Sequence, residues 1–179
     1  IRSVFDTGWA WGDREFIVYE GERLTFNEHH RAASALARAL TDKYGVQKGD
    51  RVAIAMRNIP EFSIAFWAAI AIGAVVTPLN GWGTGEDLAY GLTDSQTKVA
   101  IMDGERLDRV APLLKDCGLV GLIAVRTPRD QLHGADALEE LIGPASGYKD
   151  LPADPPPDVG IEPDDDATIL YTSGTTGKP

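Results

Sequence analysis

Short runs of apolar residues recur along the chain, separated by stretches in which charged and small residues are mixed. The three clearest runs are Val52–Met56, Val99–Met102 and Leu119–Val125. None of them alternates between apolar and polar residues, as a strand with one face in water would. We therefore interpret them as strands covered on both faces, which are typical of a parallel sheet.

Helical patterns lie between these runs. Apolar residues recur at helical spacing after Asn27, which we expect to be the N-cap of a first helix. The apolar stripe of this helix consists of Ala33, Leu36, Ala37, Leu40 and Tyr44. Pro60 suits the first turn of a second, nearly all-apolar helix, and Thr84 with Asp87 resembles a capping box before a third. Further helices are predicted at Glu105–Leu114 and around Ala137–Ile142. Strands alternating with helices predict an α/β fold, a doubly wound and largely parallel sheet with helices on both faces.

Three other stretches have different patterns. Glu15–Thr25 is typical of a β-hairpin, so we expect a small hairpin before the sheet. Residues 143–166 hold six prolines, several acids and few apolar residues, which predicts a long exposed connection. The apolar run Ala167–Tyr171 then predicts one more buried strand.

Composition narrows the function classes. The formal net charge of −10 argues against a nucleic-acid partner, because such partners need clustered Lys and Arg. Cys117 is the only cysteine, so an internal disulfide is impossible, and we expect a cytoplasmic protein. His29, His30 and His133 have no ligand partner at metal-binding spacing, and we assign them no chemistry.

The stretch Phe62–Leu79 contains eighteen residues without a charge, which is the lower limit for a membrane-spanning helix. Gly73, Thr77 and Pro78 interrupt it, so a helix followed by a short strand fits better. We expect no transmembrane span, while peripheral membrane contact stays open. The N-terminus lacks the basic start and apolar core of a signal peptide. Because the chain starts at Ile1 and ends within a motif, we expect a fragment of a longer protein.

The candidate chemistry lies in Tyr171–Pro179, which reads Tyr-Thr-Ser-Gly-Thr-Thr-Gly-Lys-Pro. Glycines let backbone N–H groups turn toward an anion, hydroxyls add donors, and Lys178 adds positive charge. We interpret the segment as a loop that holds phosphate oxygens. It is not a Walker A loop, because only two residues separate Gly174 from Gly177. The alternative is a surface loop rich in turn-forming residues. We interpret Asp164-Asp165-Asp166 as a solvated acidic run rather than a metal site.

These nine residues resemble the phosphate-binding loop of the adenylate-forming superfamily, which includes acyl-CoA synthetases, luciferases and the adenylation domains of peptide synthetases. Leu24–Glu28 and the helix after it look like the opening hairpin and first long helix of that family. Phe66–Asn80 resembles its first core motif. The resemblance runs from about Phe16 to the C-terminus. It implies that residues 1–179 are the N-terminal part of an AMP-binding domain, with the remainder and a C-terminal domain downstream.

The resemblance also implies a two-step reaction. A carboxylic acid, most simply a fatty acid, attacks the α-phosphate of ATP to give an acyl-adenylate and pyrophosphate, and the thiol of coenzyme A then displaces AMP. The implied cofactors are ATP, Mg²⁺ and coenzyme A. The implied binding residues are Thr172, Ser173, Gly174, Thr175, Thr176, Gly177 and Lys178, with Thr172 also a contact for Mg²⁺. Catalytic residues are expected only downstream, so this stretch alone should be inactive.

Several alternatives stay open at this point. Leu79-Asn80 after Pro78 favours acyl-CoA synthetases, but an aryl-CoA ligase or a peptide-synthetase adenylation domain has the same loop. A non-catalytic nucleotide-binding relative and a membrane-associated protein are the other classes. The acyl substrate, the choice between coenzyme A and a carrier protein as acceptor, and the oligomeric state are not specified by these residues.

Overall fold

A five-stranded parallel sheet forms the centre of the computed structural model, which describes residues 2–172. Its strand order is β4-β3-β5-β6-β7. The strands are β3 (Arg51–Ala55), β4 (Val75–Pro78), β5 (Thr97–Asp103), β6 (Gly121–Val125) and β7 (Asp136–Ala137). The three apolar runs are therefore neighbouring parallel strands, as predicted. An antiparallel hairpin of β1 (Glu15–Tyr19) and β2 (Glu22–Thr25) stands apart from the sheet.

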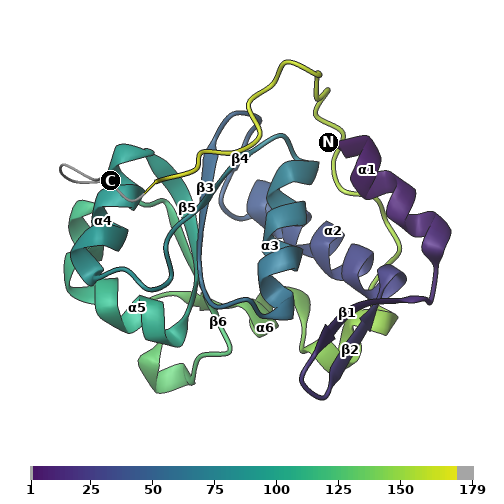
Figure 1. The fold of residues 1–179 in the computed structure, drawn as a ribbon, viewed down its shortest axis with the longest axis horizontal. Coiled ribbons are helices and arrows are strands. Elements are labelled where there is room, and N and C mark those ends of the chain that lie inside the picture. Colours follow the sequence, from purple (N-terminus) through teal and green to yellow (C-terminus); the bar gives the residue numbers. More distant parts are fainter. Residues whose placement is uncertain (1, 173–179) are drawn as a thin grey trace.

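Helices cover both faces of the sheet, which confirms the doubly wound fold class (Figure 1). On one face lie α2 (Phe26–Asp42), α3 (Pro60–Ala71) and the short α6 (Leu138–Ile142). On the other lie α4 (Gly85–Asp94) and α5 (Gly104–Val110). None of the helices in the described part of the chain is both long and apolar enough to cross a bilayer.

Side-chain size differs between the two faces of the sheet. Val52, Ile54, Val99, Ile101 and Ile123 join the core under α2 and α3. Their neighbours in the strands point the other way, and most are alanines that let α4 and α5 approach closely: Ala53, Ala55, Ala100 and Ala124. All of these residues are buried, which explains why the runs contain no polar position.

Capping residues fix where the helices begin. The expectation that Asn27 caps α2 was wrong, because Thr25 is the N-cap. Thr25 has extended backbone geometry at the end of β2, and its hydroxyl accepts from the backbone N–H of Glu28. In return, the backbone N–H of Thr25 donates to the carboxylate of Glu28 at 2.8 Å. Asn27 lies inside the helix. The capping box of Thr84 with Asp87 and the N-terminal position of Pro60 in α3 are as predicted.

Several elements differ from the sequence prediction. An N-terminal helix α1 (Arg2–Thr7), continued by a 3₁₀ turn at Gly8–Trp11, and the two-residue strand β7 were missed. The helix predicted at Glu105–Leu114 ends at Val110 and continues as a 3₁₀ turn, because Pro112 cannot supply the next helical N–H. The connection that begins at residue 143 contains a 3₁₀ turn at Ala145–Asp150.

The predicted buried strand at Ala167–Tyr171 is an exposed edge segment instead. It runs parallel to β4, and its one bridge pairs Thr168 with Val76. Val76 donates to the carbonyl of Ala167 and accepts from the N–H of Ile169, both at 2.9 Å. Leu170 is 71% exposed, because the segment has a strand neighbour on only one side within the described residues.

The adjacent histidines of α2 are buried under the N-terminal segment. The ring of His30 lies between the carbonyl oxygens of Phe5 and Phe26. His29 contacts the hydroxyl of Ser63 at 3.0 Å through Nε2, while its Nδ1 has no partner among the described residues. Burial, with a smaller contribution from His30, lowers the pKa of His29 to about 3.

This burial predicts acid sensitivity of the fold. A depressed histidine pKa stabilises the folded state fully above pH 6.5, and that stability is lost as the pH falls toward 3. The free energy of unfolding should therefore drop by about 2 kcal/mol between pH 6.5 and 5. Denaturant titrations of the wild type and of His29→Gln should show a flatter dependence in the variant. His133→Gln, which changes an exposed histidine, is the control and should keep the wild-type slope.

Candidate functional site

A cleft of about 440 Å³ opens at the carboxyl edge of the sheet, beside the ends of β3, β4 and β5. The chain leaves β3 for α3 on one face and leaves β5 for α5 on the other. Loops from two neighbouring strands diverge here, and this is where doubly wound sheets bind ligands. The lining side chains used below are Tyr19, Arg57, Phe62, Trp82 and Arg106.

A buried arginine forms the floor of this cleft. Arg106, in the first turn of α5, is 1% exposed. Its Nη1 lies 3.2 Å from the carboxylate of Asp103 and 2.8 Å from that of Glu105. Asp103 ends β5 and also accepts the backbone N–H groups of Arg106 and Arg57. The charge of Arg106 is thus compensated by the carboxylates of Asp103 and Glu105. Asp103 also ties the end of β5 to the end of β3 through the N–H of Arg57.

The loop after β4 is held by arginine side chains that bind its backbone. Nε of Arg106 donates to the carbonyl of Gly81 at 2.7 Å, and Nη1 of Arg109 donates to that of Gly83 at 3.1 Å. The side chain of Asn80 accepts the N–H of Trp82 at 3.0 Å. These contacts fix the backbone on both sides of Trp82, whose side chain remains 76% exposed.

Arg57 supplies an uncompensated positive charge at the same place. It lies two residues beyond the end of β3 and is exposed, and no carboxylate pairs with its guanidinium among the described residues. Its side chain lies 5.9 Å from the ring of Trp82, with Arg106 on the same ring at 5.6 Å. An exposed indole beside a free guanidinium suits a ligand that combines a planar ring with negative charge.

The hairpin closes one side of the cleft through Tyr19. Arg126, at the end of β6, donates two hydrogen bonds of 2.7 Å to the carboxylate of Glu22 and one of 2.9 Å to Glu61. Its guanidinium also lies 5.7 Å from the ring of Tyr19. The hydrogen bonds from Arg126 lower the pKa of Glu22, so this carboxylate stays charged. The hairpin is thereby fixed to the sheet edge.

The other side of β4 carries the segment that leads to the predicted phosphate loop. Because this segment runs parallel to β4, it reaches the same carboxyl edge at Tyr171 and Thr172. The hydroxyl of Tyr171 donates to the carboxylate of Asp94 at 2.7 Å, near the end of α4. Its ring meets that of Tyr90 edge-on, with 6.4 Å between centroids. Burial, and then Asp94, raise the pKa of Tyr171 to about 12.

The predicted site residues are only partly described. Thr172 is exposed at the carboxyl edge, so its hydroxyl is open to a ligand. Ser173, Gly174, Thr175, Thr176, Gly177 and Lys178 lie outside the described residues. Sequence reasoning missed Arg57 and Trp82. The available signals were a polar pair, Arg57-Asn58, directly after a buried strand, and a tryptophan between two glycines after Leu79-Asn80.

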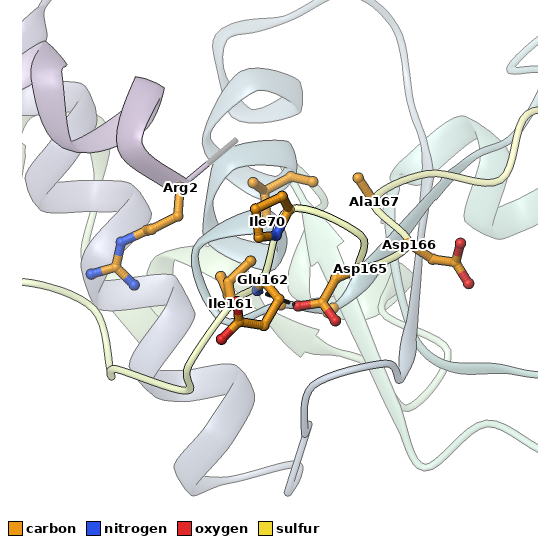
Figure 2. Close-up of a pocket in the computed structure, with 10 residues that line it drawn as sticks. Arg2, Ile70, Ile161, Glu162, Asp165, Asp166 and Ala167 are labelled. Carbon is orange, nitrogen blue, oxygen red and sulfur yellow. Dashed lines mark hydrogen bonds between the residues drawn. The ribbon is translucent and has the colours of Figure 1, made fainter.

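A second, much smaller cavity of about 60 Å³ lies at the opposite, amino edge of the sheet. Figure 2 shows Glu162, Asp165 and Ala167 around it, close to Ile70 of α3. Asp165 pairs with Lys48 at 2.6 Å and its side chain is 26% exposed, so this member of the acidic run is a partly buried structural residue rather than a solvated one. No group of three or more potential metal ligands occurs within residues 2–172.

Comparison with known proteins identifies the family. The sequence model described as AMP-binding enzyme matches residues 6–179. The chain belongs to this family, and the resemblance to adenylate-forming enzymes is thereby confirmed. It is 34% identical over 94% of its length to the acetyl-coenzyme A synthetase of Vibrio parahaemolyticus serotype O3:K6, of which it spans 28%.

Two further comparisons show how widely the same fold is used. The chain is 34% identical over its whole length to tyrocidine synthase 1 of Brevibacillus parabrevis, of which it spans 14%. Its structure resembles that of the anthranilate CoA ligase AuaEII in complex with anthranoyl-AMP, with a TM-score of 0.86 and 18% identity. That match covers 99% of this chain and 33% of the ligase, so it supports the fold.

The Tyr171–Asp94 contact predicts a late tyrosine titration. A tyrosine whose pKa is raised stabilises the fold fully below pH 10, and that contribution is lost between pH 10 and about 12. The difference in phenolate absorption between the wild type and Tyr171→Phe should show titration near pH 12. When Tyr171→Phe is instead compared in an Asp94→Asn background, this titration should move toward pH 10. In an Asp130→Asn background, which changes an exposed acid elsewhere, the titration should stay near pH 12. An unchanged titration in Asp94→Asn would contradict the contact.

Proposed function

We propose that the full-length protein containing this chain activates a carboxylic acid with ATP as an acyl-adenylate and then transfers the acyl group to coenzyme A. The observation that carries the proposal is the family match over residues 6–179, which includes the whole loop sequence. Support comes from the position of Thr172, where that loop begins at the carboxyl edge of the sheet. Under this proposal, residues 1–179 are the N-terminal part of an AMP-binding domain.

In this proposal the loop holds the β- and γ-phosphates of ATP. Backbone N–H groups of Gly174 to Gly177 and the hydroxyls of Ser173, Thr175 and Thr176 are the donors, and Lys178 adds positive charge. Thr172 would contact Mg²⁺ through its exposed hydroxyl. When bound, Mg²⁺ offsets phosphate charge as pyrophosphate leaves. The catalytic groups are assigned to the sequence that corresponds to the rest of the relatives, and so is the adenine site unless the cleft described next holds ATP.

The cleft between β3 and β5 is proposed to take the nucleotide end of a cosubstrate. Trp82 offers a ring for adenine to stack on, and Arg57 offers a charge for phosphate. Both ATP and coenzyme A contain an adenine nucleotide, so the two half-reactions are needed to assign the cleft to one of them.

A fatty acid is our first choice of substrate, and the cytoplasm is the proposed location. An aryl acid is the alternative substrate, and a carrier protein is the alternative acceptor. The relatives do not choose between these, since one named as an acetyl-coenzyme A synthetase and one named as tyrocidine synthase 1 are equally similar to the chain, at 34% identity. A non-catalytic relative is the remaining alternative, and it would show no acid-dependent exchange of pyrophosphate into ATP.

Replacing Gly174 by Val tests the loop. The branched side chain should displace the backbone donors, and adenylation should slow by roughly a hundredfold, as for the loss of one well-placed donor. Thioester formation from synthetic acyl-adenylate should change much less, because that step involves no β- or γ-phosphate. Gly147→Val is the matched control, since a side chain there meets open space. Equal losses in both half-reactions, with the fold intact by circular dichroism, would contradict this role.

Replacing Trp82 by Ala tests whether the cleft binds ATP or coenzyme A. Loss of a stacking ring should raise the KM of the cosubstrate held there by about tenfold, the lower part of the range for base stacking on an aromatic side chain. Pyrophosphate exchange reports the KM for ATP, and thioester formation from acyl-adenylate reports that for coenzyme A. Trp11→Ala, which changes an exposed tryptophan outside the cleft, is the control. No change in either constant would remove the cleft from the mechanism.

A further inference from the structure

The connection to the phosphate loop is tethered along its whole length by basic side chains. We call residues 151–166 the strap. It runs along the side of α1 and α2 and then crosses to the sheet edge (Figure 1). Arg31 donates to the carbonyl of Leu151, Arg38 to that of Asp154 at 3.0 Å, and Arg2 to that of Pro157 at 3.2 Å. These bonds reach backbone carbonyls, so they fix the path of the strap largely independently of its side chains.

Lys48 makes the last of these tethers and binds the strap twice. Its Nζ donates to the carbonyl of Gly160 at 2.9 Å and pairs with the carboxylate of Asp165 at 2.6 Å. The same carboxylate accepts the backbone N–H of Glu162 at 2.6 Å, a contact drawn in Figure 2. The hydrogen bond from Lys48 is the main reason that the pKa of Asp165 is lowered. Lys48 and Asp165 thus close the turn at the end of the strap.

The start of β4 packs against this turn. Gly73 precedes β4 in a left-handed conformation, with φ of 67°. A Cβ added there would lie 3.0 Å from Cγ of Lys48 and 3.3 Å from Cγ1 of Ile161, so only glycine lets both side chains approach. The carbonyl of Gly73 also accepts the N–H of Gly49, next to Lys48, at 2.8 Å. Lys48 is therefore held close to the first residues of β4.

Pairing with β4 begins two residues after Asp165. Ala167 and Ile169 exchange hydrogen bonds with Val76, and these are the backbone bonds that align the edge segment with β4. One bridge specifies register only weakly, because a slip would cost few bonds. A slip by one residue would also turn Tyr171 away from Asp94 and move Thr172 along the carboxyl edge.

We propose that Lys48 and Asp165 are a positioning pair that sets the register of residues 167–172 against β4 and so sets the position of Thr172. Their action is indirect, since Asp165 lies beside the small cavity of Figure 2 at the amino edge of the sheet, and Lys48 pairs with it there. The catalytic part of this inference rests on the proposed function, whereas the register can be tested without any activity.

Amide hydrogen exchange in the full-length protein tests the register. In Lys48→Met, exchange at the N–H groups of Ile169 and Val76 should accelerate by about tenfold, the factor expected from loss of a charge-assisted hydrogen bond. Lys48→Arg should restore most of the protection, since it keeps the donors. Lys43→Met is the matched control, because Lys43 pairs with Asp136 at 2.7 Å on β7, at the opposite edge of the sheet. It should leave both amides unchanged.

A double-mutant cycle with Asp165→Asn shows whether the two residues act together. The double variant should exchange at Ile169 no faster than the more affected single variant. Unchanged protection of Ile169 in Lys48→Met would overturn the proposal. So would an equal loss of protection throughout the sheet, because that would be general destabilisation rather than a change of register.

The two half-reactions then test the consequence for chemistry. For Lys48→Met, kcat/KM for ATP in pyrophosphate exchange should fall by about tenfold, because small displacements of binding groups have large effects on rate. Thioester formation from synthetic acyl-adenylate should stay at the wild-type value. Equal loss in both half-reactions would overturn the positioning role. If the wild-type protein shows no pyrophosphate exchange with any acid, the proposed function fails, and the amide hydrogen-exchange data still decide the register.

Discussion

The burial of β3 on every side is the constraint on which the rest of the structure depends. This strand has β4 and β5 as hydrogen-bonded neighbours and is covered by α2 and α3 on one face and by α4 and α5 on the other. Each of its residues from Val52 to Ala55 is completely buried, so each must be apolar and sized for its face. Since β3 lies next to strands whose connections diverge, the same constraint also creates the cleft at its carboxyl end.

Much of this fold could be predicted because burial leaves a strong pattern. Continuous apolar runs, Pro60 at a helix start and Thr84 with Asp87 act locally, and each was interpreted correctly. Asn27 failed because two capping residues competed, and the end of β2 placed Thr25 in the extended geometry that an N-cap needs. The segment at residues 167–171 failed for another reason. Its composition suits a buried strand, but its exposure depends on how many strands flank it, which composition does not record.

The candidate site was predictable to a smaller extent. A loop of glycines and hydroxyls can be recognised from sequence because its chemistry is contiguous, and the family match agrees with that interpretation. The cleft is different, because Tyr19 comes from the hairpin and Arg57 and Trp82 from two separate loops, and only the tertiary structure brings the three together. The basic residues that hold the strap could not be recognised either. Their partners are backbone carbonyls more than a hundred residues away, which have no sequence signal.

The two arginines of the cleft have different roles: Arg106 holds the structure of a loop, and Arg57 is open to a ligand. The pair of Arg106 with Asp103 is buried, and such pairs contribute little net stability because desolvation offsets their attraction. Its effect is geometric, because Nε of Arg106 donates to the backbone beside Trp82, and Asp103 accepts the N–H of Arg57 and so joins the ends of β3 and β5. Arg57, two residues beyond the end of β3, keeps its charge free. Although the chain has a net charge of −10, no carboxylate within residues 2–172 pairs with this exposed guanidinium at the mouth of the cleft. A phosphate group arriving there would find one arginine already compensated and rigid and another still available, which is the arrangement that binding an anion without unfolding the loop requires.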